Sequence, residues 1–297
     1  MNRNPEEELY TLADYFANRP DHIQGAGGNI SVKMENRMCI KASGMTFREI
    51  RSMKGHVQLG YQQVADYFMQ TEKPREIGET ESLNQIALSL LPGETNKPSM
   101  ETGFHAALGR VVVHTHSAMA NVLNCACNCR EWISKIGKKL GFEPLFISYK
   151  SPGYALSREI GIAVKKGKVP PVIFLQNHGI IVHTEEVEEA VDLINRTDDA
   201  IRSLLNLEDY IHFNQESKNH IYTNYLFPDQ VVYFNPESNS EKTKKTRSMQ
   251  EVSKLYAYLI SQMLKNSLTP NFLSEVEINY VASMEMEKHR KKAQGIE

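Results

Sequence analysis

The chain has no apolar run of about 18 or more residues, the length a transmembrane helix needs. It also lacks an excess of either charge, because its 34 basic and 36 acidic residues nearly cancel. Nothing therefore indicates a surface for nucleic acid or another polyanion. The first eight residues are polar and lack the apolar stretch of a signal peptide, so we expect a cytoplasmic protein.

Cysteine is scarce too, with four residues in 297, and three of them are closely spaced: Cys125, Cys127 and Cys129. Residues 117–135 are predicted to form a helix, on which positions two apart point to different faces. The three sulfur atoms then cannot converge on one ion. We predict that these cysteines pack as small buried residues, with a disulfide as the less favoured alternative in an intracellular protein.

Apolar periodicity and turn residues predict helices that alternate with strands through most of the chain. The expected helices cover residues 7–18, 61–69, 81–91, 101–108, 117–135, a segment ending near 166, a long segment from 185, and residues 248–265 and 272–292. The expected strands cover residues 30–33, 38–41, 110–116, 145–149, 172–176 and 227–234.

At this length, the chain fits one large α/β domain with an extension. We predict a domain over residues 1–234. Residues 235–297 are predicted to form a polar linker followed by helices, which pack on the same domain or on a neighbouring subunit. No internal repeat is evident in the sequence.

A pair of histidines ends the apolar strand predicted over residues 110–116. His114 and His116 lie two positions apart, so both imidazoles point to the same side of the strand. Two neutral nitrogens held this close suit a divalent metal such as zinc. The alternative is a pair of hydrogen-bonded core histidines. His178, in a turn directly after the strand of residues 172–176, is well placed to be a third ligand, and three histidines with an open position are typical of a catalytic metal.

Glycines cluster in the turn over residues 24–29. This is not a dinucleotide-binding fingerprint, because Ile30 stands where the third glycine belongs and a strand follows instead of a helix. One interpretation is a plain hairpin turn. The other is an anion-binding nest of backbone N–H groups, assisted by the Asn29 side chain and by a second loop over residues 42–44.

Five motifs occur in an order and spacing that resemble the class II aldolase/adducin family. They are residues 28–31, 41–44, 101 with 104–105, 114–116 and 177–179, and the resemblance covers about residues 8–207. Within the family the chain is similar to zinc-dependent fuculose- and rhamnulose-phosphate aldolases, especially the aldolase part of bifunctional rhamnulose-phosphate aldolase proteins. The resemblance implies a three-layer α/β/α fold with a largely antiparallel central sheet, and a homotetramer with active sites between subunits.

The resemblance also implies roles for individual residues. It assigns one zinc ion per chain to three ligands, His114, His116 and His178. It assigns acid–base catalysis to Glu101, and to Tyr149 a position in the site of a neighbouring subunit. It assigns the substrate phosphate to Asn29, Ser43, Gly44 and Ser99. The chain departs from the family pattern at Met100, where many relatives have a second phosphate-binding serine, and in a shortened segment between residues 105 and 110.

The implied reaction is cleavage of a ketose phosphate to dihydroxyacetone phosphate and an aldehyde. Zinc would act as a Lewis acid on the ketone fragment. Glu101 would transfer a proton to and from the reacting carbon, and Tyr149 would act at the aldehyde oxygen. Each role has a structural alternative. Glu101 at a helix N-terminus would complement the helix dipole, Tyr149 would pack at an interface, and for His105 we favour a structural hydrogen bond.

Three other functions remain open at this point. A ribulose-phosphate 4-epimerase uses the same retro-aldol step, although such relatives tend to have Asp at the position of Glu101. A methylthioribulose-phosphate dehydratase also fits a histidine-rich zinc site. A non-catalytic scaffold similar to the adducin head would keep the fold without the metal, which the three histidines and Glu101 argue against.

Overall fold

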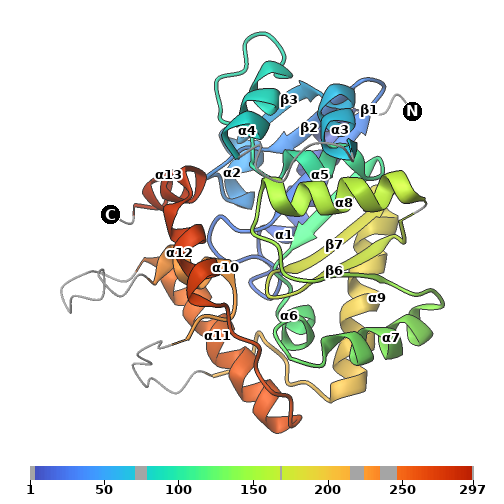
Figure 1. Ribbon diagram of the computed structural model, residues 1–297, viewed down its shortest axis with the longest axis vertical. Coiled ribbons are helices and arrows are strands. Elements are labelled where there is room, and N and C mark those ends of the chain that lie inside the picture. The colour runs from blue at the N-terminus through green and yellow to red at the C-terminus, as the bar shows by residue number, and fades with distance from the viewer. Residues whose placement is uncertain (1–3, 71–78, 168, 215–223, 235–245, 296–297) are drawn as a thin grey trace.

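A single mixed sheet forms the centre of the computed structural model, which describes residues 4–70, 79–167, 169–214, 224–234 and 246–295. Its strand order is β3-β2-β1-β4-β7-β6-β5 (Figure 1). All neighbouring strands are antiparallel except β5 and β6, which run parallel. The strands are β1 (Asn29–Met34), β2 (Arg37–Lys41), β3 (His56–Gly60), β4 (Val111–Thr115), β5 (Leu145–Ile147), β6 (Val172–Leu175) and β7 (Gly179–Thr184).

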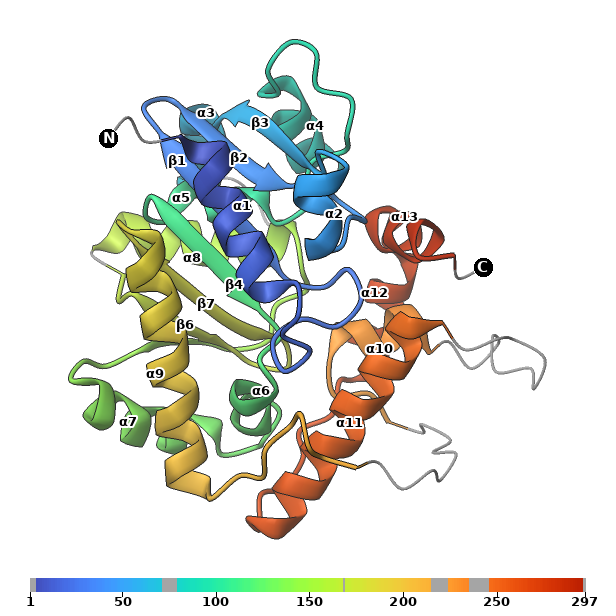
Figure 2. The same cartoon turned by 180° about the vertical axis from the view of Figure 1, so that it is seen from behind.

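Helices cover both faces of the sheet, so the predicted three-layer α/β/α fold with a largely antiparallel sheet is confirmed. Figure 1 shows one face covered by α3 (Tyr61–Met69), α5 (Thr102–Ala107) and α8 (Tyr154–Lys166). Figure 2 shows the other face, covered by α1 (Pro5–Phe16) and α9 (Val187–Leu205). The remaining helices on the domain are α2 (Phe47–Ser52), α4 (Glu79–Leu88), α6 (Ala118–Asn124) and α7 (Cys129–Leu140).

Strand β4 sits at the middle of the sheet, and every one of its residues is buried. Val111 and Val113 pack into the large core beneath α1 and α9, whereas Val112 packs into the core beneath α5 and α8. Because side chains alternate along a strand, His114 shares the direction of Val112. The strand thus directs its histidine toward the layer that contains α5.

The C-terminal part of the chain lies along one side of the domain as α10 (Pro228–Tyr233), α11 (Arg247–Lys265), α12 (Glu275–Ser283) and α13 (Glu285–Ala293). Helix α11 packs against α6 and α10, and α10 also contacts α12 and α13. Most of the predicted linker, residues 235–245, lies outside the described residues. The division of the chain at residue 234 therefore stays a prediction.

Several predicted elements differ from the structure. The strand expected over residues 227–234 is wrong: this segment forms α10, which begins with Pro228, a residue favoured in the first turn of a helix. The single helices expected over residues 117–135 and 272–292 are each two helices, α6 with α7 and α12 with α13. Strands β3 and β7 were not predicted, because each follows a short turn and its periodicity does not separate it from the preceding element.

The cysteine prediction is correct for two of the three clustered residues. All four cysteines are free thiols; Cys125 and Cys129 are buried, whereas Cys127 is exposed. The exposed thiol lies in the break between α6 and α7, which the prediction of one continuous helix did not allow.

Within the described ranges, no helix is both long and apolar enough to cross a lipid bilayer.

A buried lysine closes the C-terminal end of α5. The Lys33 ammonium donates to three backbone carbonyls, those of His105, Leu108 and Gly109. The carbonyls at the C-terminal end of a helix have no hydrogen-bond donor within the helix. The Lys33 ammonium supplies that donor to these three carbonyls, which would otherwise stay unpaired. The same helix is fixed to β1 by a hydrogen bond of 2.8 Å between Ser31 Oγ and His105 Nδ1, which confirms the structural interpretation of His105.

We predict that Lys33→Met lowers the free energy of unfolding by about 2 kcal/mol, because three buried carbonyls lose their donor while the apolar chain length is kept. Chemical denaturation measures the change. Lys139→Met, at an exposed position of α7, is the matched control and should change stability by less than about 0.5 kcal/mol. Equal stability of the Lys33 and Lys139 variants would contradict the capping role.

Candidate metal centre

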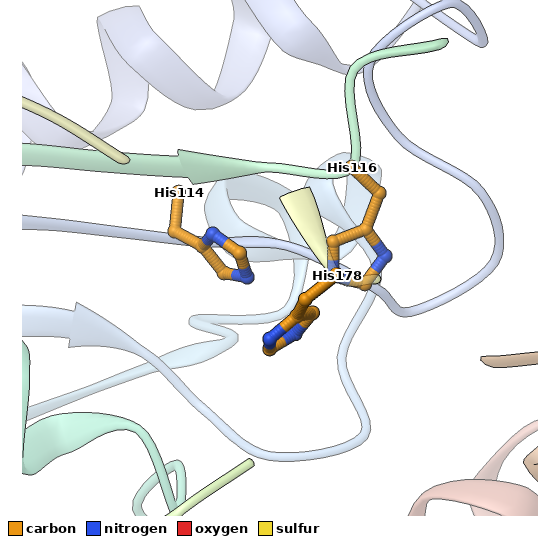
Figure 3. Close-up of side chains that lie close together, drawn as sticks. All are labelled: His114, His116 and His178. Carbon is orange, nitrogen blue, oxygen red and sulfur yellow. The ribbon is translucent and has the colours of Figure 1, made fainter. Parts of the chain in front are cut away.

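Three histidines meet at one end of the central strands (Figure 3). His114 belongs to β4, His116 follows the end of that strand, and His178 lies in the turn between β6 and β7. One ring nitrogen from each lies within 4.8 Å of the other two, and all three residues are buried. This spacing and donor set suit a divalent metal ion.

The turn that carries His178 depends on a close approach between strands. An added Cβ at Gly179 would collide with the backbone carbonyl of Thr115 on β4, so only glycine allows the strands to come this close. The preceding residue, Asn177, has a φ of 54°, in the left-handed region. Its side-chain amide donates to the carbonyls of Leu226 at 2.7 Å and Asn271 at 2.6 Å. The C-terminal part of the chain thereby fixes the turn.

Hydrogen bonds orient two of the imidazoles. His114 Nδ1 lies 3.0 Å from the carbonyl oxygen of Ile180 and donates to it, which leaves Nε2 as the free nitrogen. His116 Nδ1 lies 2.8 Å from Asp229 Oδ2. Such partners are typical of metal-ligating histidines, because they fix the ring and the tautomer. Burial lowers the pKa of His114 and of His178, and so favours the neutral imidazoles that bind metal.

Asp229 is itself held by an arginine from the C-terminal helix. Arg290 lies 2.5 Å from Asp229 Oδ1; the Asp229 side chain is buried and that of Arg290 is mostly buried, with 14% exposed. Burial alone would raise the pKa of Asp229, but the Arg290 guanidinium and His116 hold it well below its ordinary value. The carboxylate is therefore ionised and accepts a hydrogen bond from His116 Nδ1. The chain Arg290–Asp229–His116 connects α13 to the histidine cluster.

The Glu101 carboxylate faces the same cluster. Its Oε1 lies 3.5 Å from His114 Nε2 and 3.6 Å from His178 Nε2. Glu101 stands at the N-cap of α5, but its side chain makes no capping hydrogen bond. The side chain points to the histidines instead. This orientation favours a catalytic role for Glu101 over the alternative that its charge only complements the helix dipole.

A pocket opens beside the histidines and is lined by residues from distant parts of the chain. The four residues that the resemblance assigned to phosphate all line it: Asn29, Ser43, Gly44 and Ser99. Glu101, His116 and His178 line it as well, together with Met100. The structure therefore brings the predicted loops together around one space.

Sequence reasoning missed four charged residues of this pocket: Lys41, Asp229, Glu287 and Arg290. Lys41 donates to the carbonyls of Ala26 at 3.1 Å and Met45 at 2.8 Å, and burial lowers its pKa to about 8. The sequence does contain a signal for Lys41, because this residue begins the motif of residues 41–44. The other three come from helices that the sequence does not connect with the site.

Tyr149 does not line this pocket in the single chain. Its hydroxyl is buried and has no hydrogen-bond partner in the part of the chain that the structure describes. Burial raises the pKa of this hydroxyl, and the nearby carboxylates of Glu277 and Glu287 raise it further. Its role across a subunit interface stays a prediction.

Comparison with known proteins agrees with this geometry. Residues 7–205 match the family model of the class II aldolase and adducin N-terminal domain. The chain is 24% identical over 214 residues to an uncharacterized oxidoreductase, YuxG, of Bacillus subtilis, a match that takes in 67% of this chain. The chain spans only 30% of the length of that relative.

Solved structures share the fold. The N-terminal class II aldolase domain of a conserved protein from Thermoplasma acidophilum superposes with a TM-score of 0.58 at 22% identity, over 69% of this chain and 95% of that one. A sugar-phosphate aldolase from Thermotoga maritima superposes with a TM-score of 0.50 at 17% identity, over 71% of this chain and 97% of that one. The family match covers about two thirds of the sequence, and the chain belongs to the class II aldolase and adducin family.

Proposed function

We propose that this protein is a metal-dependent aldolase that cleaves a ketose phosphate to dihydroxyacetone phosphate and an aldehyde. The observation that carries the proposal is the buried cluster of His114, His116 and His178 with the Glu101 carboxylate directed at it. A non-catalytic scaffold would have no use for three buried imidazoles packed together around one carboxylate. The chain belongs to the class II aldolase and adducin family, and the class II aldolases of that family are metal-dependent enzymes.

We propose zinc as the metal, one ion per chain, held by the three histidines. When bound, such an ion supplies a Lewis acid that stabilises the negative charge left on the ketone fragment. The protein itself orients two of the ligands through the Ile180 carbonyl and the Asp229 carboxylate. These contacts leave the Nε2 atoms of His114 and His116 directed away from their partners, as a metal site requires.

Glu101 is proposed as the acid–base group at carbon. Breaking the bond between C3 and C4 of a ketose 1-phosphate leaves an electron pair on C3, and that carbon must then take up a proton. A carboxylate within 4 Å of two ligand histidines lies where this carbon would be held. In the direction of condensation the same carboxylate removes the proton again.

The substrate phosphate is proposed to bind between the loops of Asn29, Ser43, Gly44 and Ser99. Asn29 lines the pocket, and its side-chain NH2 group is the one that can donate to a phosphate oxygen. Gly44 lines the pocket and has a φ of 78°, a conformation that glycine adopts without strain. Met100 lines the same pocket and offers no donor, so the chain has fewer hydroxyl groups here than many relatives.

We further propose a homotetramer with active sites between subunits, in which Tyr149 of one chain serves the aldehyde oxygen in another. The basis is the family resemblance together with a buried hydroxyl at this position that has no hydrogen-bond partner among the described residues. Epimerisation of ribulose 5-phosphate and dehydration of methylthioribulose 1-phosphate remain alternatives. A screen of ketose 1-phosphates and ribulose 5-phosphate with the zinc-loaded protein separates them, provided that dihydroxyacetone phosphate and epimerised product are detected separately.

We predict that His114→Ala and His178→Ala lose bound zinc, because two histidines do not complete a site of this type. Elemental analysis of the purified, zinc-loaded variants gives the metal per chain. His212→Ala, which removes an exposed imidazole far along the sequence, should retain the wild-type content. Unchanged metal in both active-site variants would contradict the assignment.

Glu101→Gln is predicted to keep the metal and the fold but to lower turnover by about 10² to 10⁴, the usual contribution of a general acid–base group. Steady-state cleavage kinetics provide the measurement, and Glu188→Gln on the exposed face of α9 provides the control. Near-normal turnover of a well-folded Glu101→Gln enzyme would leave this carboxylate without a catalytic role.

Removing a phosphate donor should weaken kcat/KM for the phosphorylated ketose. For Ser43→Ala and for Asn29→Ala we expect a loss of about 1–3 kcal/mol each, the scale of a hydrogen bond to a charged group. The same variants should lose much less with the unphosphorylated sugar. If wild-type enzyme cleaves both forms of the ketose equally well, these loops do not bind phosphate.

A further inference from the structure

The hydrogen bond between His116 and Asp229 is enclosed by the glycine-rich loop of residues 24–29. A Cβ added at Gly27 would lie 2.8 Å from both Asp229 Oδ2 and His116 Nδ1. A larger residue there would force one of these two groups to move. The His116 side chain is 5% exposed and that of Asp229 is 2% exposed. The pair is therefore packed tightly, and its geometry depends on the elements that surround it.

Asp229 uses its two carboxylate oxygens for two different partners. Its Oδ2 lies 2.8 Å from His116 Nδ1, and its Oδ1 lies 2.5 Å from Arg290 Nη2. Rotation of a carboxylate about its Cβ–Cγ bond has only a broad preference, so the torsion itself does not decide where each oxygen points. The contact of Arg290 with Oδ1 fixes this rotation, and Oδ2 is then directed at His116.

Arg290 is itself held by contacts that lie outside the histidine cluster. Glu287 Oε2, on the same helix, lies 2.7 Å from Arg290 Nε. The guanidinium also lies over the ring of Tyr233 on α10, 5.7 Å from its centroid. Removing one partner of a buried ion pair is strongly unfavourable, so the guanidinium stays between the carboxylates of Asp229 and Glu287. It forms a fixed support for Asp229.

Helix α13, which carries Arg290, also contacts the loop that we propose for phosphate binding. Gln294 Nε2 donates to the Gly44 carbonyl at 3.1 Å, and a Cβ added at Gly44 would lie 2.9 Å from the Cβ of Ala293. This helix lies outside residues 7–205, which match the family model. A helix beyond the family domain thus contacts both the partner of a histidine ligand and the phosphate loop.

We propose that Arg290 is a positioning residue for the metal centre: through Asp229 it fixes the orientation of His116, so that metal binding and the packing of α13 on the pocket stabilise each other. This inference rests on the proposed metal-dependent function. Hydrogen-bonding partners of ligand histidines typically contribute about 10- to 100-fold to metal affinity. Because linkage between two equilibria is reciprocal, the metal stabilises the packed position of α13 by a similar factor.

The first test measures zinc affinity of the full-length protein by competition with a chromogenic chelator. Arg290→Met removes the cation and is expected to raise the Kd for zinc by about 10- to 100-fold. Lys288→Met makes the same change on the same helix, at a side chain that is 56% exposed, and should leave the Kd unchanged. Thermal melting of the zinc-free variants shows whether the fold is kept.

A double-mutant cycle tests whether Arg290 acts through Asp229. Asp229→Asn is expected to weaken zinc binding as well, because it removes the charge that holds the guanidinium. If the two residues act as one unit, the variant with both Asp229→Asn and Arg290→Met should bind zinc about as weakly as the weaker single variant. Independent effects would multiply, and that result would overturn the proposed route through Asp229.

Hydrogen–deuterium exchange of the wild-type protein tests the reciprocal effect without any substitution. Saturating zinc is expected to slow amide exchange of residues 285–293 by about 10- to 100-fold. The same helix should gain much less protection in zinc-saturated Arg290→Met. An arginine with a purely structural role would change the exchange of α13 equally with and without zinc, and would leave its zinc dependence intact.

Unchanged zinc affinity of a folded Arg290→Met protein would overturn this inference, as would wild-type α13 exchange that does not depend on zinc. Zinc binding that His178→Ala abolishes and Arg290→Met leaves intact refutes the role of Arg290 alone. If the wild-type protein binds no zinc, or if His178→Ala binds it as tightly as wild type, the proposed metal site is refuted together with this inference.

Discussion

Three imidazole rings are buried side by side at the centre of this protein, and each buried ring nitrogen needs a partner. Neutral rings keep a hydrogen-bonding nitrogen on each side, and buried polar atoms without partners destabilise a fold. Here the Ile180 carbonyl and the Asp229 carboxylate satisfy one nitrogen each on His114 and His116. The free nitrogens point into the common space, which a metal ion would fill. The surrounding sheet, the glycine at the β4–β7 approach and the C-terminal helices all maintain this arrangement.

The residues of the site are far apart in the sequence but close together in space. The antiparallel pairing of β1 with β4 places Asn29 opposite His114, so the predicted phosphate loop begins beside a metal ligand. Pairing of β4 with β7 brings the His178 turn to the same edge. The phosphate loops, the histidines and Glu101 then surround one pocket. In the proposed reaction, remote phosphate contacts would supply orientation, while the histidines and Glu101 would act at the bond that breaks.

The sequence predicted the histidine cluster because it depends on local patterns: alternation in β4, the H-x-H spacing and glycine after a strand. The family and the layer architecture followed from the resemblance that five short motifs carry. It did not predict Asp229, Glu287 or Arg290 as site residues, because only tertiary packing brings α10 and α13 to the pocket. The segment over residues 227–234 shows the difficulty. Its valines and aromatic residues favour a strand, but the segment is buried among helices and forms α10. This helix places Asp229 against His116.

The central claim is that the three histidines form a metal site that serves chemistry in this pocket. Anomalous X-ray diffraction on crystals of the zinc-loaded protein, at the zinc absorption edge, tests it most directly. We expect one peak per chain at about 2.0–2.1 Å from a ring nitrogen of each of His114, His116 and His178, with an open position toward the pocket. The absence of a peak there, or a peak bound elsewhere on the chain, would contradict the claim.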